Sequence, residues 1–140
     1  MDMGRERRIR AAVDTNVLLG RHRNQILLFA SLVVYTLVTS SYIVEELRSM
    51  MEQLGWRHEN REALLQTLLT VAMFVDYRLI TGGSYDKWLT DPDDHPIMAA
   101  ALVGQVDYLV TDNTRHFPPK RRFAAITIVT CDGFLSLLQR

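Results

Sequence analysis

The sequence predicts an α/β fold, a three-layer α/β/α sandwich with a mainly parallel central sheet. Short apolar runs typical of buried strands alternate with longer segments of helical periodicity along the whole chain. A chain of 140 residues can build one sizeable core but not two. Because no repeat, low-complexity segment or interdomain linker is visible, we expect a single domain over residues 1–140, with residues 1–8 forming a flexible basic tail.

Five short segments are predicted as strands because they are apolar and rich in β-branched or aromatic residues. The first ends at Asp14, since a polar residue directly after an apolar run marks the carboxyl end of a buried strand. The predicted strands cover residues 10–13, 35–39, 77–80, 108–111 and 125–129.

The helices are predicted from apolar stripes bounded by capping residues. Thr15 begins a turn into a first short helix that is broken near Gly20. Ser40 or Ser41 caps a helix that stops at Gly55, and Asp94 caps another that stops at Gly104. The longer predicted helices cover residues 25–34, 41–54, 61–75, 95–103 and 133–139. Their expected core-facing residues include Ile43, Leu47, Met50, Leu54, Leu64, Leu65, Leu68, Leu69 and Ala72.

Four acidic positions stand where a strand ends or a helix begins: Asp14, Glu46, Asp94 and the Asp112-Asn113 pair. In an open α/β sheet the carboxyl ends of parallel strands form one edge, where sites assemble. Two carboxylates about 4 Å apart near a protein surface repel by roughly 4 kcal/mol, so a cluster of them implies a bound cation. Oxygen ligands of this kind favour Mg²⁺ or Mn²⁺. The sequence therefore predicts a divalent-metal site.

Each of these positions also has an ordinary structural interpretation. The DTN and DPDD segments supply good helix caps, and the pair after the strand at 108–111 suits a turn. Glu46 lies beside the apolar stripe of its helix, whereas Glu45 is turned further from it. All four positions together, in this order, are much less expected by chance than any one of them, so we favour the functional interpretation.

Composition argues against several classes of protein. Lys plus Arg and Asp plus Glu each number 16, so net charge indicates no partner. The single Cys131 cannot form an intrachain disulfide, and a hydrophobic content of 48% fits a globular protein. The longest apolar stretch, residues 26–38, is shorter than a membrane span and contains Ser31 and Thr36. We therefore expect a cytoplasmic protein with no membrane segment.

Three motifs resemble those of the PIN-domain family, a nuclease fold that includes the toxin ribonucleases of toxin–antitoxin pairs. They are VDTNVLL (residues 13–19), SSYIVEEL (40–47) and DPDDHPIMAAALVGQVDYLVTDNTRHF (91–117), and the resemblance covers essentially the whole chain. It implies a PIN-like fold with a Mg²⁺- or Mn²⁺-dependent site. Asp14, Glu46 and Asp94 match the first three acidic positions, and Thr15 and Asn16 belong to the first motif as supporting residues.

The fourth position departs from the commonest family pattern, which reads Thr, any residue, Asp. Here Thr111, a supporting residue, is followed by Asp112 and Asn113. Asn113 falls where the Asp is expected and brings no charge, while Asp112 can replace it if the loop turns its side chain inward. Both are therefore candidate metal ligands, and the number of metal ions, one or two, stays open.

The site suits hydrolysis of RNA phosphodiester bonds. A divalent cation lowers the pKa of a bound water, and Glu46 is our candidate acceptor of the water's proton. The candidate catalytic residues are Asp14, Glu46, Asp94 and Asp112, and the candidate metal ligands are Asp14, Asp94, Asp112 and Asn113.

Basic residues follow two of the strands that carry site residues, as a nuclease requires to hold a polyanion beside an acidic pocket. One segment follows Asp14, and the other, which includes His116, follows Asp112. The candidate RNA-binding residues are Arg21, Arg23, Arg115, Lys120, Arg121 and Arg122.

The leading hypothesis is a metal-dependent endoribonuclease that acts as a toxin on RNA. The resemblance also implies a protein antitoxin and a homodimer, for which an apolar surface is offered by Met50, Met51, Leu54 and Trp56. The neutral Asn113 motivates an alternative, a catalytically weak or inactive PIN-like module that binds RNA or a protein partner. A receiver-like phosphorylation domain ranks lower, because neither Lys87 nor Lys120 is well placed after an apolar strand.

Overall fold

The central sheet is built from short segments, and β-branched residues are frequent in β2, β4 and β6. The computed structural model describes residues 7–79, 91–119 and 121–140, and within these residues six strands form one sheet in the order β3-β2-β1-β4-β6-β5. All neighbouring strands are parallel except β5, which runs antiparallel to β6. The strands are β1 Arg10–Val13, β2 Thr36–Thr39, β3 Met73–Phe74, β4 Tyr108–Val110, β5 Arg122–Phe123 and β6 Ile126–Val129.

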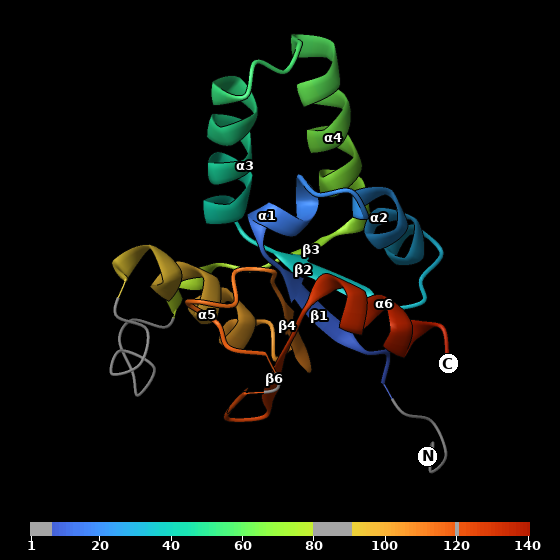
Figure 1. Cartoon of the computed structure of the whole chain (residues 1–140), viewed down its shortest axis with the longest axis vertical. Coiled ribbons are helices and arrows are strands. Elements are labelled where there is room, and N and C mark those ends of the chain that lie inside the picture. The colour runs from blue at the N-terminus through green and yellow to red at the C-terminus, as the bar shows by residue number, and fades with distance from the viewer. Residues whose placement is uncertain (1–6, 80–90, 120) are drawn as a thin grey trace.

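The helices connect these strands. Two of them, α3 and α4, stand side by side and project from the sheet in Figure 1, and the ion pair between Arg48 and Glu62 joins them at 3.6 Å. None of the helices that the structure describes combines the length and the apolar character that crossing a bilayer requires. The helices are α1 Thr15–Leu18, α2 Arg23–Ser31, α3 Ser41–Gln53, α4 His58–Val71, α5 His95–Val103 and α6 Cys131–Leu138, with 3₁₀ turns at Tyr77–Leu79 and Pro92–Asp94.

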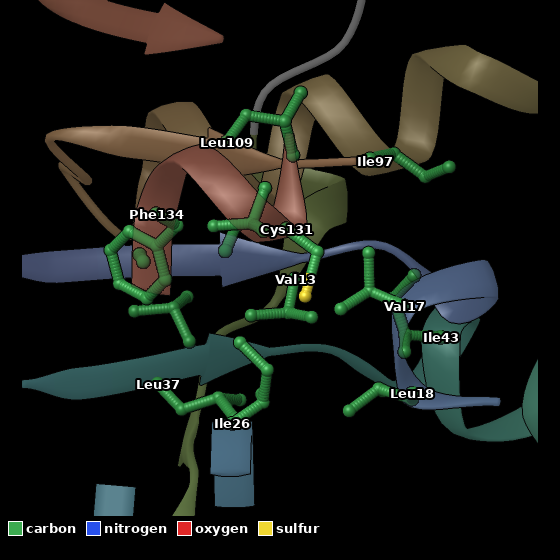
Figure 2. Close-up of a cluster of buried hydrophobic side chains, with 14 of the residues drawn as sticks. Val13, Val17, Leu18, Ile26, Leu37, Ile43, Ile97, Leu109, Cys131 and Phe134 are labelled. Carbon is green, nitrogen blue, oxygen red and sulfur yellow. The ribbon is translucent and has the colours of Figure 1, made fainter. Parts of the chain in front are cut away.

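Helices cover both faces of the sheet. Side chains alternate between the faces along each strand, so consecutive apolar residues give the sheet two apolar faces to bury. On one face, the Tyr35 hydroxyl donates to the Ile26 carbonyl in α2 at 2.9 Å, and its ring lies 5.0 Å from that of Phe134 in α6. Leu37 belongs to the same buried cluster (Figure 2). On the other face, Val38 packs against the end of α5. The three predicted layers are therefore confirmed.

Among the described residues, three helices are followed by a residue in the left-handed region. After α3 this residue is Gly55 (φ 76°), which confirms the predicted stop there. After α5 it is Gln105 (φ 51°), and Gly104 has another role: a Cβ atom on it would lie 2.7 Å from Cγ1 of Val38. After α2 it is Val33 (φ 61°), where a β-branched residue costs about 1–2 kcal/mol. Glycine thus allows α5 to approach β2 closely.

Some sequence-based boundaries were wrong. The helix predicted over residues 61–75 is α4, which begins earlier, at His58, and ends earlier, at Val71. It ends earlier because the chain leaves the helix at Ala72 and forms β3 with Met73–Phe74. The strand expected at 77–80 is instead the 3₁₀ turn Tyr77–Leu79, with residue 80 outside the described residues. Helical periodicity does not reveal a two-residue strand. Leu54 and Leu69 are 64% and 46% exposed, so α3 and α4 bury narrower stripes than expected.

Candidate active site

Three carboxylates from different elements line one small cavity at the carboxyl edge of the sheet. Asp14 follows β1, Glu46 lies in the second turn of α3, and Asp94 ends the 3₁₀ turn before α5. The cavity has a volume of about 140 Å³. The structure therefore brings the first three predicted acidic positions together. The cavity's other lining residues are Thr15, Asn16, Met50, Asp93, Ile97 and Asn113.

Asp14 is held firmly although it is buried. Its Oδ1 accepts a hydrogen bond from the Thr15 backbone N–H at 2.7 Å, and its Oδ2 accepts one from the Thr111 hydroxyl at 2.8 Å. Burial raises the pKa of Asp14 to about 6; these two hydrogen bonds oppose the rise, and the charges of Glu46 and Asp94 add to it. Burial and the neighbouring carboxylates thus outweigh the two hydrogen bonds that favour the ionised form of Asp14.

Glu46 is held by two hydroxyl groups from different elements. Oε1 accepts a hydrogen bond from Thr15 at 2.5 Å, and Oε2 accepts a longer one from Tyr42 at 3.4 Å. Burial, and then the charge of Glu46, raises the pKa of Tyr42, so its hydroxyl remains a donor at neutral pH. Glu45 is exposed and does not line the acidic cavity, so the geometry favours Glu46 of the two.

Asp94 occupies the N-cap position of α5, but its side chain makes no capping hydrogen bond. Its Oδ2 lies 2.6 Å from Nδ1 of His116, and the residue is 6% exposed. Burial raises the pKa of Asp94, and the hydrogen bond to His116 opposes this rise. The ordinary capping interpretation therefore does not account for the Asp94 carboxylate.

The fourth position divides its two candidates between the two faces of the sheet. Val13 pairs with Val110, so Asp14 and Thr111 stand level and on the same face. Side-chain alternation then directs Asp112 to the opposite face, where its Oδ1 accepts a hydrogen bond from the Cys131 backbone N–H at 2.9 Å. Asn113 returns to the cavity and lines it.

Two of the predicted RNA-binding residues lie near the acidic edge. Arg115 is exposed in the loop between Asn113 and His116. Burial raises the pKa of the Cys131 thiol, at the start of α6, to about 11. Arg21 lies close enough to this thiol for its positive charge to oppose the rise. Both arginines therefore lie in segments next to the carboxyl edge of the sheet.

The other predicted basic residues lie elsewhere. The guanidinium of Arg23 is 4.9 Å from the Trp56 ring centre and lines a separate groove between α2 and α4. Arg122 pairs with Thr127, which is level with Tyr108 and, through it, with Ala11. Arg122 therefore lies near the amino ends of the parallel strands and away from the carboxyl edge, because β5 runs antiparallel to β6. Arg121 precedes it, and Lys120 lies outside the described residues.

Sequence reasoning did not assign site roles to Tyr42, Met50, Asp91 or His116. His116 was grouped with the basic RNA-binding segment, although its imidazole contacts a carboxylate of the cavity. The available signal was a histidine within a few residues of a predicted site position. Only tertiary structure shows that the loop returns it to Asp94.

The lining of the cavity fits a hard divalent cation. The carboxylates of Asp14, Glu46 and Asp94, together with the amide of Asn113, offer oxygen atoms, and Mg²⁺ and Mn²⁺ prefer such donors. A cation would also stabilise the ionised form of Asp14, whose pKa is raised by burial and then by the charges of Glu46 and Asp94. Sheet and cavity together define the chain as an α/β domain with an acidic, oxygen-donor site at the carboxyl edge.

Comparison with known families agrees with this class. The chain belongs to the PIN domain family, whose model matches residues 10–115. Among solved structures, it is similar to a chain in the crystal structure of VapBC2 from Rickettsia felis bound to a DNA fragment from their promoter. The TM-score is 0.58 at 18% sequence identity, and the match covers 87% of this chain and 98% of that chain. No curated protein matches the sequence. The predicted fold class is confirmed.

Proposed function

We propose that this PIN domain is a metal-dependent endoribonuclease, the toxin of a toxin–antitoxin pair, that acts on RNA in the cytoplasm. The observation that carries the proposal is the meeting of Asp14, Glu46 and Asp94 in one cavity. PIN domains are generally nucleases, and the similarity to a chain of the VapBC2 complex supports the toxin–antitoxin context.

Each residue of the cavity has a distinct role in this proposal. A Mg²⁺ or Mn²⁺ ion would supply the Lewis acid that activates a water for attack on phosphorus. Asp14 and Asp94 would hold the ion, and the hydrogen bonds from Thr15 and Thr111 keep the Asp14 oxygens oriented. The longer contact between Glu46 Oε2 and Tyr42 leaves this oxygen able to accept the water's proton.

The fourth position contributes differently from the other three. Asn113 would offer a neutral oxygen to the ion or to a water bound to it, since its side chain lines the cavity. Asp112 would act indirectly, by holding the start of α6 against the end of β4 through Cys131. The Thr111 hydroxyl donates a hydrogen bond to Asp14 and accepts one from the Asn113 backbone N–H at 3.1 Å, which makes Thr111 a supporting residue.

Cleavage of single-stranded RNA with Mn²⁺ tests the proposal. We expect the wild-type chain to cleave, chelation with EDTA to stop cleavage, and Asp14→Asn to lower the rate by at least about 100-fold. Asp132→Asn, an exposed carboxylate in α6, is the matched control and should cleave as the wild type does. Equal cleavage by the wild type and Asp14→Asn would show that the assigned site is wrong.

A second candidate function is an RNA- or protein-binding module with little activity, which the neutral Asn113 motivates. Fluorescence anisotropy with the same RNA distinguishes the two. Binding by both the wild type and Asp14→Asn, with cleavage by neither, would favour the module. We expect Arg115→Ala and Arg21→Ala to weaken binding at low salt more than Arg122→Ala, because Arg122 lies away from the carboxyl edge.

The partner in this proposal is a protein antitoxin that covers the acidic cavity, with an arginine reaching its carboxylates. A groove of about 760 Å³ between α2 and α4 offers an anchoring surface, lined in part by Leu27, Leu28 and Leu64. Leu28 is 52% exposed there. Co-expression with the product of the neighbouring gene tests the partner, and Leu28→Asp should weaken the complex while leaving RNA cleavage unchanged.

A homodimer is also part of the proposal, but fewer of the four apolar residues suggested for its interface are available on the surface. Met51 is fully buried and Met50 lines the acidic cavity, whereas Leu54 is 64% exposed. Light scattering after size-exclusion chromatography tests the assembly. If Leu54 lies in the interface, Leu54→Glu should shift the mass towards that of a monomer.

A further inference from the structure

A histidine and two carboxylates meet beside the acidic cavity. One ligand atom each from Asp91, Asp94 and His116 lies within 4.8 Å of the other two. Nδ1 of His116 is 2.6 Å from Oδ2 of Asp94 and 3.9 Å from Oδ2 of Asp91. One nitrogen and two oxygens therefore converge, whereas the cavity of Asp14 and Glu46 offers oxygen atoms alone.

The chain holds these three side chains in place by local contacts. Oδ1 of Asp91 accepts a hydrogen bond from the Asp93 backbone N–H at 2.9 Å, which leaves Oδ2 directed to His116. The loop that carries His116 is fixed by the next residue, Phe117, which is fully buried and whose N–H donates to the Asn113 carbonyl at 2.9 Å. Asp94 is itself buried at the start of α5.

We propose that Asp91, Asp94 and His116 form a second cation site, which takes a transition-metal dication such as Mn²⁺, Co²⁺ or Zn²⁺. Bonds of about 2.0–2.2 Å place neighbouring ligand atoms roughly 3.0–3.5 Å apart. The His116–Asp94 and His116–Asp91 separations of 2.6 and 3.9 Å lie within about 1 Å of this range, and all three ligand atoms lie within 4.8 Å of one another. Asp94 would serve both sites, with Oδ2 facing His116 and its other oxygen left for the acidic cavity.

The imidazole nitrogen determines which ion this site takes. Nitrogen ligands strengthen binding of Mn²⁺, Co²⁺ and Zn²⁺, while Mg²⁺ and Ca²⁺ prefer oxygen. The two neighbouring sites would therefore differ in the ion they favour. A cation bound at His116 Nδ1 would replace the contact between this nitrogen and Asp94 Oδ2. The inference does not require nuclease activity, because it concerns metal binding.

Titration of the full chain with Co²⁺ in the presence of saturating Mg²⁺ tests this site. Visible absorption of Co²⁺ reports nitrogen coordination, and calorimetry gives the number of ions bound. We expect His116→Gln and Asp91→Asn each to weaken Co²⁺ binding by at least about tenfold. His58→Gln, an exposed histidine at the start of α4, is the matched control and should bind as the wild type does.

The outcome also separates this site from the proposed nuclease site. Asp14→Asn should retain one Co²⁺ ion with an unchanged absorption spectrum, since Asp14 is not among the three ligands. Wild-type affinity in both His116→Gln and Asp91→Asn would overturn the proposal. Circular dichroism and thermal unfolding of each variant distinguish a lost ligand from a lost fold.

Discussion

At the scale of single residues, the buried, ionised Asp14 lowers the stability of the metal-free protein. Both of its oxygens accept hydrogen bonds, yet burial still raises its pKa from 3.8 to about 6. Below pH 3.8 the folded and unfolded chains both carry the proton, and between 3.8 and 6 only the folded chain retains it. The stability contributed by protonated Asp14 is therefore lost as the pH rises through this range.

We therefore predict that Asp14→Asn stabilises the metal-free protein at pH 8, because asparagine carries no buried charge. The rise in pKa sets an upper limit of roughly 3 kcal/mol for this gain. The gain should shrink towards zero as the pH falls to about 4, where wild-type Asp14 is protonated. Urea unfolding in EDTA at several pH values measures it. Glu52→Gln, an exposed carboxylate in α3, should show no such trend. A gain that does not change with pH would contradict the explanation.

The pair at the fourth position gives a second prediction at this scale. Asp112→Ala should lower the free energy of unfolding by about 1 kcal/mol, because the Cys131 N–H loses its acceptor. Cleavage by this variant should change little. Asn113→Ala should do the reverse, lowering cleavage with little effect on stability, since Asn113 lines the cavity. Parallel measurement of unfolding and RNA cleavage compares them, and an activity loss confined to Asp112→Ala would reverse the assignment.

At the scale of elements, the approach of α5 to β2 depends on the absence of one side-chain carbon. A Cβ atom at position 104 would lie 2.7 Å from Val38 Cγ1, closer than packed atoms allow. We predict that Gly104→Ala destabilises the protein by about 1–3 kcal/mol. Combined with Val38→Ala, which makes room for the new methyl group, the cost should be smaller than the sum of the two single changes. Thermal unfolding of the four proteins gives the coupling, and simple additivity would contradict this contact.

The end of α2 offers the opposite opportunity. Val33 adopts a left-handed conformation (φ 61°) and is 52% exposed, so it gains little packing in return for its strained backbone. Val33→Gly should raise the free energy of unfolding by about 0.5–1 kcal/mol. Its neighbour Val34 has no positive φ, so Val34→Gly should lower stability and serves as the control in the same chemical denaturation.

Elements with a clear chemical boundary could be predicted from the sequence, and those without one could not. The predicted helix over residues 95–103 coincides with α5, because Asp94 precedes an apolar run and Gly104 follows it. By contrast, β3 and β5 have only two residues each, too few to show a period. The site shows the same limit. That Asp14, Glu46 and Asp94 lie in one cavity could be predicted from their places at strand and helix ends, but that Asn113 and not Asp112 lines it required the register of Val13 with Val110.

At the scale of the whole molecule, a bound cation should stabilise the fold that its ligands come from. Mg²⁺ at about 100 times its dissociation constant adds roughly 2.7 kcal/mol, which corresponds to a rise in melting temperature of about 5–10 °C. We predict this rise for the wild type at pH 8 and a smaller rise at pH 5, where Asp14 holds a proton that competes with the ion. Differential scanning calorimetry measures it. Asp14→Asn should show little response, and an equal response in both proteins would place the Mg²⁺ elsewhere.

The strand order also determines how late in translation the cavity can form. β4 lies between β1 and β6, so the strand beside Asp14 is made long after Asp14 itself. A nascent chain that has emerged only as far as α4 carries Asp14 and Glu46 but lacks Asp94, Thr111 and Asn113. The cavity therefore cannot assemble until the segment through Asn113 has left the ribosome. A ribosome translating this chain would be shielded, for most of that time, from the ribonuclease we propose it is making.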